Sequence, residues 1–286
     1  MSETALRLTG KTRVLAVFGC PVEHSLSPAM HNAAIRALGL DLVYVPFRVE
    51  PERLPDAVAG VRAMGFLGVN LTIPLKERAV SLVDGLTEAA ARVESVNTLW
   101  WKEGLLMGDS TDGPGFISSL EEAGGLPETA LVLGAGGSGR AICFALAQRG
   151  VRIILANRTP ERARRLAAEL GEAGVRVIPM DADTLKEACR KADLVVNCTS
   201  VGMSPNIGVS PLPAEAIRGG QTVYDLVYNP PETRLLADAR AAGARAINGV
   251  RMLVHQGAYS FRLWTGIQPP LDVMEAAVME GLLQGA

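Results

Sequence analysis

Three glycines near the middle of the chain constrain the fold more than any other feature. Gly134, Gly136 and Gly139 stand in GxGxxG spacing, directly after the apolar run ALVL and directly before an Ala-rich stretch that extends to Arg149. In this context glycine permits a tight turn, close approach of the backbone to a pyrophosphate, and close packing of a helix on a strand. The segment therefore predicts a strand, a dinucleotide-binding loop and a helix; a plain glycine turn is the alternative.

Strand-like and helix-like stretches alternate on both sides of this loop. Before it come VLAVFG, a helix over 28–38, LVYVPF, a helix after Pro51, and LGVNLTI. After it come VRIILANR, a helix over 160–170, VRVIPM, DLVVNCTS and TVYDLVY. Strands separated by helices of this length favour parallel pairing in an α/β fold.

The length of 286 residues suggests two domains. The segment KEGLLMGDSTDGPG lies between the two series, and its Lys-Glu-Gly centre predicts a hairpin while its glycines and proline indicate a junction. After Gly249 only helical patterns remain. We expect an α/β substrate domain with a mostly parallel sheet over 1–111 plus 250–286, and a Rossmann-like domain over 112–249. The C-terminal helices should pack back on the first domain.

The residues after the strand VRIILA indicate which dinucleotide is bound. Enzymes that use NAD usually carry an acid there, which holds the ribose 2′-hydroxyl. This chain has Asn157-Arg158-Thr159, without a carboxylate, and a guanidinium can pair with the 2′-phosphate of NADP. Arg162, one turn into the next helix, either adds a second positive charge or is a solvated helix residue.

Polar residues interrupt the apolar run GVNLTIP in the first domain. Asn70 and Thr72 are two apart, so in a strand they share a face, and buried polar groups need partners. Pro74 suits a helix start, yet Lys76 in a first turn would lie at the wrong end of the helix dipole. A ligand-directed lysine explains this placement, and a surface lysine is the alternative.

Hydroxyl and carboxylate groups occur in two further segments. Ser25 and Ser27 flank Leu26, so in an extended stretch both hydroxyls face one way; Ser27 before Pro28 could also be a helix N-cap. Asp112, in GDSTDGPG at the domain junction, either serves the chemistry or belongs to a turn.

Composition excludes several classes of function. The net charge of −2 and a pI of about 6.0 give no sign of a nucleic-acid partner. The four cysteines form no CxxC pair, and the three histidines lack metal-ligand spacing, so neither disulfides nor a metal are expected. Without a leader-like start or a membrane-length apolar run, a cytoplasmic location is expected.

Nine segments, in order along nearly the whole chain, resemble the shikimate dehydrogenase family: GCPVEHSLSPAMHN, VNLTIPLKE, ESVNTL, GDSTDGPG, LGAGGSGRA, NRT, NCTSVGM, YDLVYNPPET and INGVRMLVHQG. The resemblance implies reversible NADPH-dependent reduction of 3-dehydroshikimate to shikimate in the biosynthesis of aromatic amino acids. It also implies a small-molecule substrate and a monomer or homodimer.

The resemblance assigns roles at matching positions. It implies that Lys76 and Asp112 are the catalytic pair, which also contacts substrate. The remaining substrate-binding positions are Ser25, Ser27, Asn70, Thr72, Asn97, Tyr228 and Gln256. The NADP-binding positions are Gly134, Ala135, Gly136, Gly137, Ser138, Gly139, Asn157, Arg158, Thr159, Arg162, Gly249 and Met252. Reduction of a ketone needs a proton donor at the oxygen, and the reverse oxidation needs a base there, so one residue can serve both directions.

Two departures from the family pattern stand out. Ser110 replaces the Asn of the usual GDNTDG, and Glu94-Ser95 stands where small residues are common. Two alternatives stay open: a quinate/shikimate dehydrogenase of broader specificity, and a non-catalytic NADP-binding sensor. Ser27 and Arg158 argue against the first, and Lys76 with Asp112 argues against the second.

Overall fold

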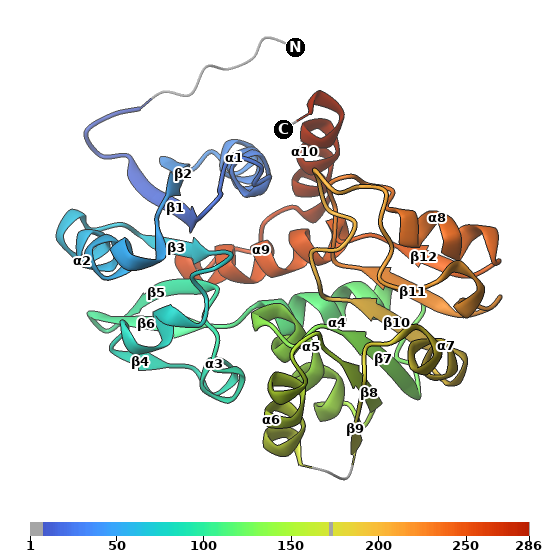
Figure 1. Ribbon diagram of the computed structural model, residues 1–286. Coiled ribbons are helices and arrows are strands. Elements are labelled where there is room, and N and C mark those ends of the chain that lie inside the picture. Colours follow the sequence, from blue (N-terminus) through green and yellow to red (C-terminus); the bar gives the residue numbers. More distant parts are fainter. Residues whose placement is uncertain (1–7, 172–173, 286) are drawn as a thin grey trace. The chain divides into compact units, whose positions relative to one another are not determined.

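The glycine loop follows a strand of an all-parallel sheet (Figure 1). In the computed structural model, which describes residues 8–171 and 174–285, the strand order is β12-β11-β10-β7-β8-β9. The strands are β7 (Thr129–Leu133), β8 (Arg152–Ala156), β9 (Val175–Ile178), β10 (Leu194–Asn197), β11 (Thr222–Asp225) and β12 (Arg245–Ile247). This is the order of a doubly wound dinucleotide-binding sheet, and it reverses between β7 and β10, where such sheets bind ligands. The predicted Rossmann-like sheet is confirmed.

Helices cover both faces of this sheet because its strands are apolar on both sides. Ala130 and Val132 of β7 pack with one group of helices, and Leu131 and Leu133 pack with another. The first group is α4 (Asp112–Glu122), α5 (Gly137–Gln148), α6 (Pro160–Leu170) and α9 (Val250–Thr265). The second group is α7 (Ala182–Lys191) and α8 (Arg234–Ala241).

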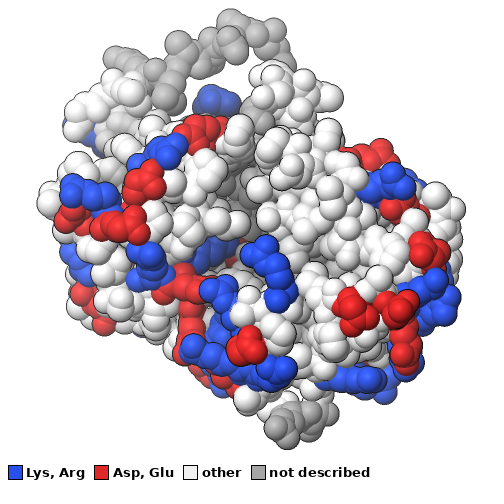
Figure 2. All heavy atoms as spheres, in the orientation of Figure 1, with Lys and Arg blue, Asp and Glu red and all other residues white. Residues whose placement is uncertain are grey.

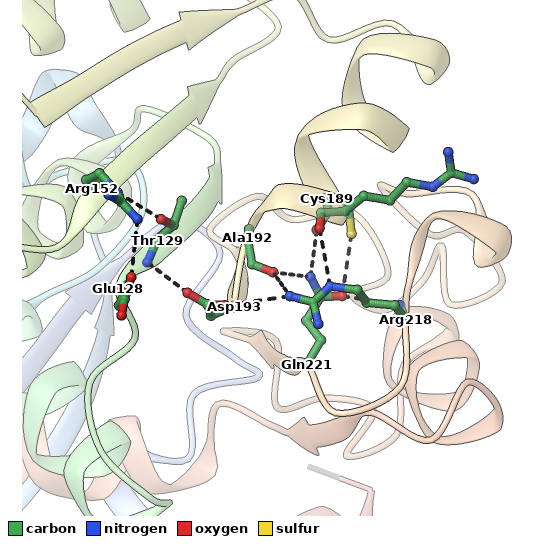
Figure 3. A network of polar contacts seen from close by, with 9 residues as sticks. Glu128, Thr129, Arg152, Cys189, Ala192, Asp193, Arg218 and Gln221 are labelled. Carbon is green, nitrogen blue, oxygen red and sulfur yellow. Dashed lines mark hydrogen bonds and ion pairs between the residues drawn. The ribbon is translucent and has the colours of Figure 1, made fainter.

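A network of polar contacts lies at the amino end of this sheet (Figure 3). Buried Gln221 donates from Nε2 to the carbonyl oxygens of Cys189 and Ala192, each at 2.7 Å, and Arg218 donates to the same Ala192 oxygen at 3.0 Å. These carbonyls are among those that a helix end leaves unsatisfied. The network therefore caps α7 at the sheet end opposite the glycine loop.

A second sheet is mixed, in the order β2-β1-β3-β5-β6-β4. Its strands are β1 (Arg13–Gly19), β2 (Leu42–Arg48), β3 (Gly68–Leu71), β4 (Gly85–Leu86), β5 (Thr98–Lys102) and β6 (Leu105–Asp109). The pairs β1–β2, β1–β3 and β4–β6 are parallel, and β3–β5 and β5–β6 are antiparallel. The predicted hairpin is β5–β6, whose turn residues Glu103 and Gly104 have φ of 53° and 82°, as a type I′ turn requires.

Helices also flank the mixed sheet. They are α1 (Ser27–Ala37), α2 (Leu54–Met64), α3 (Glu88–Val93) and α10 (Leu271–Gln284). Leu54 and Val58 of α2 enter a core with Val69 and Leu71 of β3. C-terminal α10 packs on α1 so closely that a Cβ at Gly281 would lie 2.7 Å from Leu26 Cδ2. The expected return of the C-terminal helices to the first domain is confirmed.

The chain divides into two compact units. The first comprises residues up to Ala91, Ser95–Asp109 and those from Ser260 onward; the second comprises Arg92–Glu94 and Ser110–Tyr259. Helix α9 therefore contributes residues to both units, and its first ten residues belong with the dinucleotide-type sheet.

Charged side chains outside the cores form no large patch of one sign on the face drawn in Figure 2, where acidic and basic residues are intermixed. Within residues 8–171 and 174–285, no helix combines the length and apolar character needed to cross a bilayer. No cluster of three or more His, Cys, Asp or Glu in the same ranges could hold a metal ion. All four cysteines are free thiols.

Candidate functional site

Ser25 and Ser27 lie at the start of α1. The backbone N–H of Ser27 donates to Ser25 Oγ at 3.3 Å, and Leu26 between them has helical dihedral angles of −88° and −1°. The expected extended stretch is therefore a tight turn. Leu26, not Ser27, is the N-cap residue, and no side chain caps α1. The N-cap alternative for Ser27 is thus wrong, because Ser27 already belongs to the helix.

Asn70, buried in β3, is held by a polar cluster. Tyr44 Oη donates to Asn70 Oδ1 at 2.7 Å. Asn70 Nδ2 lies 3.1 Å from the carbonyl oxygen of Asn97, 3.2 Å from Thr98 Oγ1 and 3.0 Å from Ser260 Oγ. The buried amide thus has the partners that its burial requires.

His31 packs beside this cluster. Its ring stacks on Tyr44 with centroids 4.3 Å apart. Burial lowers the pKa of His31 to about 3, so the ring is neutral at physiological pH. It packs as a neutral ring against Tyr44, whose hydroxyl group bonds Asn70.

Thr72 and Lys76 lie beyond the end of β3, and both are half-buried. The methyl group of Thr72 occupies the space where a Cβ at Gly19 would come within 2.4 Å. The expected helix after Pro74 is only a short 3₁₀ turn, Arg78–Ser81, and Lys76 precedes it. The dipole argument for Lys76 therefore does not apply, because no helix begins at that residue.

Lys76 is nevertheless fixed by its backbone. Its carbonyl oxygen accepts from Val96 N at 2.9 Å, and the residue after Val96, Asn97, donates its N–H to the carbonyl of Asp109 at 3.0 Å. Asn97 is buried, and its side-chain Oδ1 accepts from Thr98 Oγ1 at 3.1 Å. In the first unit the structure thus brings Lys76, Asn97 and Asn70 into one bonded framework around β3 and β5.

Asp112 is the first residue of α4 in the second unit, and it is 4% exposed. The alternative that Asp112 belongs to a turn is wrong, because α4 begins at this residue. Proline is tolerated in a first turn, and a carboxylate there interacts favourably with the helix dipole. Ser138 Oγ donates to Asp112 Oδ2 at 3.0 Å. This bond connects the glycine loop to the predicted catalytic carboxylate.

The glycine loop has the shape that a dinucleotide phosphate needs. Gly134 has φ of 107°, and a Cβ at Gly139 would lie 2.2 Å from the carbonyl oxygen of Gly134, so both positions require glycine. A Cβ at Gly136 would meet nothing within 4 Å. Gly136 is the N-cap of α5, whose first N–H groups lack helical acceptors. The loop therefore fits the pyrophosphate of a dinucleotide such as NADP.

The end of β8 is tied to this loop. Asn157 Oδ1 accepts from Ala135 N at 3.0 Å, and Asn157 Nδ2 donates to the carbonyl of Thr159 at 2.8 Å. Arg158 and Arg162 are exposed, and neither has a carboxylate partner among the residues of the described ranges. The acidic residue nearest to them in the sequence, Glu161, pairs with Arg164.

Asp225, at the carboxyl end of β11, was not expected from the sequence. Its carboxylate accepts from Asn197 Nδ2 at 2.9 Å, Val227 N at 3.0 Å and Thr233 Oγ1 at 2.7 Å. Burial raises the pKa of Asp225 to about 6. A carboxylate that ends a buried strand, as in TVYD, is the pattern that could have identified it.

The remaining predicted residues also belong to the second unit. Half-buried Tyr228 is three residues beyond Asp225, and Gln256 on α9 donates from Nε2 to the carbonyl of Leu253 at 2.8 Å. Gly249 is required by packing, since a Cβ there would lie 2.1 Å from the carbonyl of Leu226. Met252 is 6% exposed and enters the core beside Tyr224.

Glu94, whose presence the family resemblance leaves unexplained, has a structural role. Its carboxylate accepts from Arg165 Nη2 at 2.5 Å and lies 3.4 Å from Arg140 Nη2. Arg140, near the start of α5 and buried, also donates to the carbonyl of Val93 at 2.7 Å. These contacts explain why Arg92–Glu94 belongs to the second unit.

A doubly wound sheet with a glycine loop and a following basic pair defines a dinucleotide-binding α/β protein. Family models match three parts of the chain. Residues 17–99 match the shikimate dehydrogenase substrate binding domain, residues 122–207 match shikimate / quinate 5-dehydrogenase, and residues 249–279 match the shikimate 5′-dehydrogenase C-terminal domain. The chain belongs to the shikimate dehydrogenase family.

Individual relatives match over almost the full length. The shikimate dehydrogenase (NADP(+)) of Methanosarcina mazei is 49% identical over 276 residues, covering 94% of this chain and 99% of that protein. A crystal structure of a shikimate dehydrogenase with NADP⁺ is 40% identical, with a TM-score of 0.91 and coverage of 96% and 98%. The Thermus thermophilus shikimate 5-dehydrogenase with NADP(H) and shikimate is 45% identical, with a TM-score of 0.86 and coverage of 94% and 100%.

Proposed function

We propose that this chain is an NADP-dependent shikimate dehydrogenase, which reversibly reduces 3-dehydroshikimate to shikimate in the biosynthesis of aromatic amino acids. The observation that carries the proposal is the loop after β8. In a chain of this family, Asn157-Arg158-Thr159 offers a guanidinium and no carboxylate beside a glycine loop that fits a dinucleotide.

The second unit holds the cofactor in this proposal. Backbone N–H groups at the start of α5, after the N-cap Gly136, bind the pyrophosphate, and the guanidinium groups of Arg158 and Arg162 bind the 2′-phosphate. Asn157 and Thr159 shape the loop beside them. Gly249 and Met252 support the nicotinamide end through the packing of α9.

The first unit recognises the substrate. Ser25 and Ser27 bind the carboxylate with their hydroxyl groups; both residues lie at the turn before α1, where the Ser27 N–H donates to Ser25 Oγ. Thr72, Asn97 and Asn70 bind ring hydroxyls or the carboxylate. Gln256, in the second unit, is assigned the same role by its family position, and Tyr228 of that unit is assigned to the substrate site in the same way. Tyr44 uses one lone pair of the Asn70 amide oxygen, and such an oxygen has two.

Lys76 and Asp112 carry out the proton transfer. Bound NADPH supplies the hydride to the substrate carbonyl carbon. As negative charge develops on the carbonyl oxygen, the Lys76 ammonium gives it a proton, and in the oxidation the neutral amine removes the hydroxyl proton. Asp112 is the carboxylate partner of Lys76. The two residues belong to different units, so this pairing rests on the family match at each position.

We also propose a cytoplasmic location, since the route to aromatic amino acids uses soluble metabolites. The active form is proposed to be a monomer or a homodimer. Size-exclusion chromatography with light scattering measures the assembly directly.

Substitution of the proposed acid–base pair tests the mechanism. Lys76→Ala and Asp112→Ala should each lower kcat about 10²–10⁴-fold, the range for general acid–base groups. Lys102→Ala, which removes an exposed lysine of the same unit as Lys76, is the matched control and should leave kcat unchanged. Thermal unfolding of each variant checks the fold. Near-normal kcat in both folded variants would contradict the assigned roles.

A further inference from the structure

The hydroxyl of Ser138 points to the predicted catalytic carboxylate. Ser138 is the second residue of α5, inside the glycine loop, and its Oγ donates to Asp112 Oδ2 at 3.0 Å. Asp112 is 4% exposed and Ser138 is half-buried, so the bond is shielded from bulk water. A hydrogen bond to an ionised, buried acceptor is stronger than one between neutral groups.

The packing of α4 on α5 holds the two residues in place. A Cβ at Gly113 would lie 3.0 Å from the carbonyl oxygen of Ala141 and 3.2 Å from the Cβ of Ala145, so the first turn of α4 rests directly on α5. On another side of α4, a Cβ at Gly115 would lie 2.7 Å from the backbone nitrogen of Gln256. The backbone that carries Asp112 is thus clamped between two helices.

We propose that Ser138 is a positioning residue for the reaction: its hydroxyl orients the Asp112 carboxylate and so couples the cofactor loop to proton transfer. The inference rests on the proposed role of Asp112. A carboxylate has about four acceptor sites, and the Ser138 bond uses one of them. A carboxylate that accepts this bond can also accept from an ammonium group.

This role differs from the one expected from the sequence, in which Ser138 binds the cofactor. A serine hydroxyl has a single proton, which it cannot donate to Asp112 and to a phosphate at once. In this proposal the phosphate contact of Ser138 is assigned to its backbone N–H at the start of α5. The two roles therefore separate by atom: the backbone serves the cofactor and the side chain serves Asp112.

Ser138→Ala and Ser138→Thr separate these roles, because threonine keeps the hydroxyl. We expect Ser138→Ala to lower kcat about tenfold to a hundredfold, the effect of losing one hydrogen bond to a charged group. The Kd for NADPH, from fluorescence titration without substrate, should stay within about twofold because the backbone contact remains. Ser138→Thr should recover most of kcat. A raised Kd with unchanged kcat, or a Ser138→Ala variant equal to the parent in both, would overturn the proposal.

A double-mutant cycle distinguishes this proposal from failure of the underlying mechanism. If Ser138 acts through Asp112, adding Ser138→Ala to Asp112→Asn should lower kcat no further. If Asp112→Asn alone turns over like the parent, the role of Asp112 fails, and the positioning role of Ser138 fails with it. If the two effects instead add in full, Asp112 keeps its role and Ser138 acts elsewhere, which contradicts the inference.

Discussion

Asn157 uses both ends of its side-chain amide within the second unit. Its oxygen accepts from the backbone of Ala135, and its nitrogen donates to the carbonyl of Thr159. These two bonds fix the turn after β8 against the glycine loop, and Arg158 stands between the bonded positions. We therefore propose Arg158 as the side chain that meets the cofactor phosphate, whereas Asn157 shapes the backbone around it.

Cofactor preference should follow the charge at position 158. Arg158→Asp replaces a guanidinium that can pair with a 2′-phosphate by a carboxylate that repels it and can hold a 2′-hydroxyl. The ratio of kcat/KM for NADP⁺ to that for NAD⁺ should fall by at least about tenfold, as for loss of one charge-assisted bond. Arg164→Asp, on the helix that follows and paired with Glu161, is the control. An unchanged NADP⁺/NAD⁺ ratio of kcat/KM in Arg158→Asp would show that another group binds the 2′-phosphate.

At the scale of elements, α4 shows why glycine and proline do not always indicate a loop. The segment GDSTDGPG has the composition of a junction, yet the helix begins within it at Asp112. Pro114 falls in the first turn, where its missing N–H leaves no helical hydrogen bond unmade. Gly115 is needed because α9 approaches the backbone too closely for a side chain, and the contact of Gly113 with α5 is tight.

Asp225 acts between elements, since it bonds Asn197 at the end of β10, Val227 after β11 and Thr233 at the start of α8. Burial raises the pKa of its carboxyl from 3.8 to about 6. Between these values the folded chain binds more protons than the unfolded chain, so this group's contribution to stability is largest below about pH 4 and is lost as the pH rises through about 6.

Asp225→Asn removes this titration and should expose the effect. The free energy of unfolding of the parent minus that of the variant should fall by about 3 kcal/mol between about pH 4 and pH 7, roughly two pKa units' worth. Urea unfolding of both proteins across this range measures the difference. A difference that stays constant, or that rises with pH, would contradict the burial argument.

At the scale of the whole molecule, the sequence predicts strands and helices where the periodicity of apolar residues agrees with the positions of turn residues. The helix over 160–170 and the hairpin around Glu103 follow from such local patterns, and the structure confirms both. Helices α7 and α8 were missed, although Asp181 and Thr233 cap them by accepting from backbone N–H groups at 2.9 Å and 3.3 Å. The three-residue β12 is too short to show a period.

Residues of the site could be predicted only where they belong to a local sequence motif. The glycine loop and the basic turn after β8 are local, so their residues are recognisable in sequence. The bond from Asn70 to Ser260 joins positions 190 residues apart, and Tyr44 reaches Asn70 from another strand. Contacts of this kind depend on tertiary packing, and no local pattern indicates them.

Initial rates with shikimate and quinate, each with NADP⁺ and with NAD⁺, test the central claim most directly. The purified chain should show its highest kcat/KM with shikimate and NADP⁺, because the substrate polar set and Arg158 favour that pair. Comparable rates with quinate would indicate the broader family member. No turnover with any of the four pairs, from a folded chain that still binds NADPH, would contradict the account and indicate a protein that only binds the cofactor.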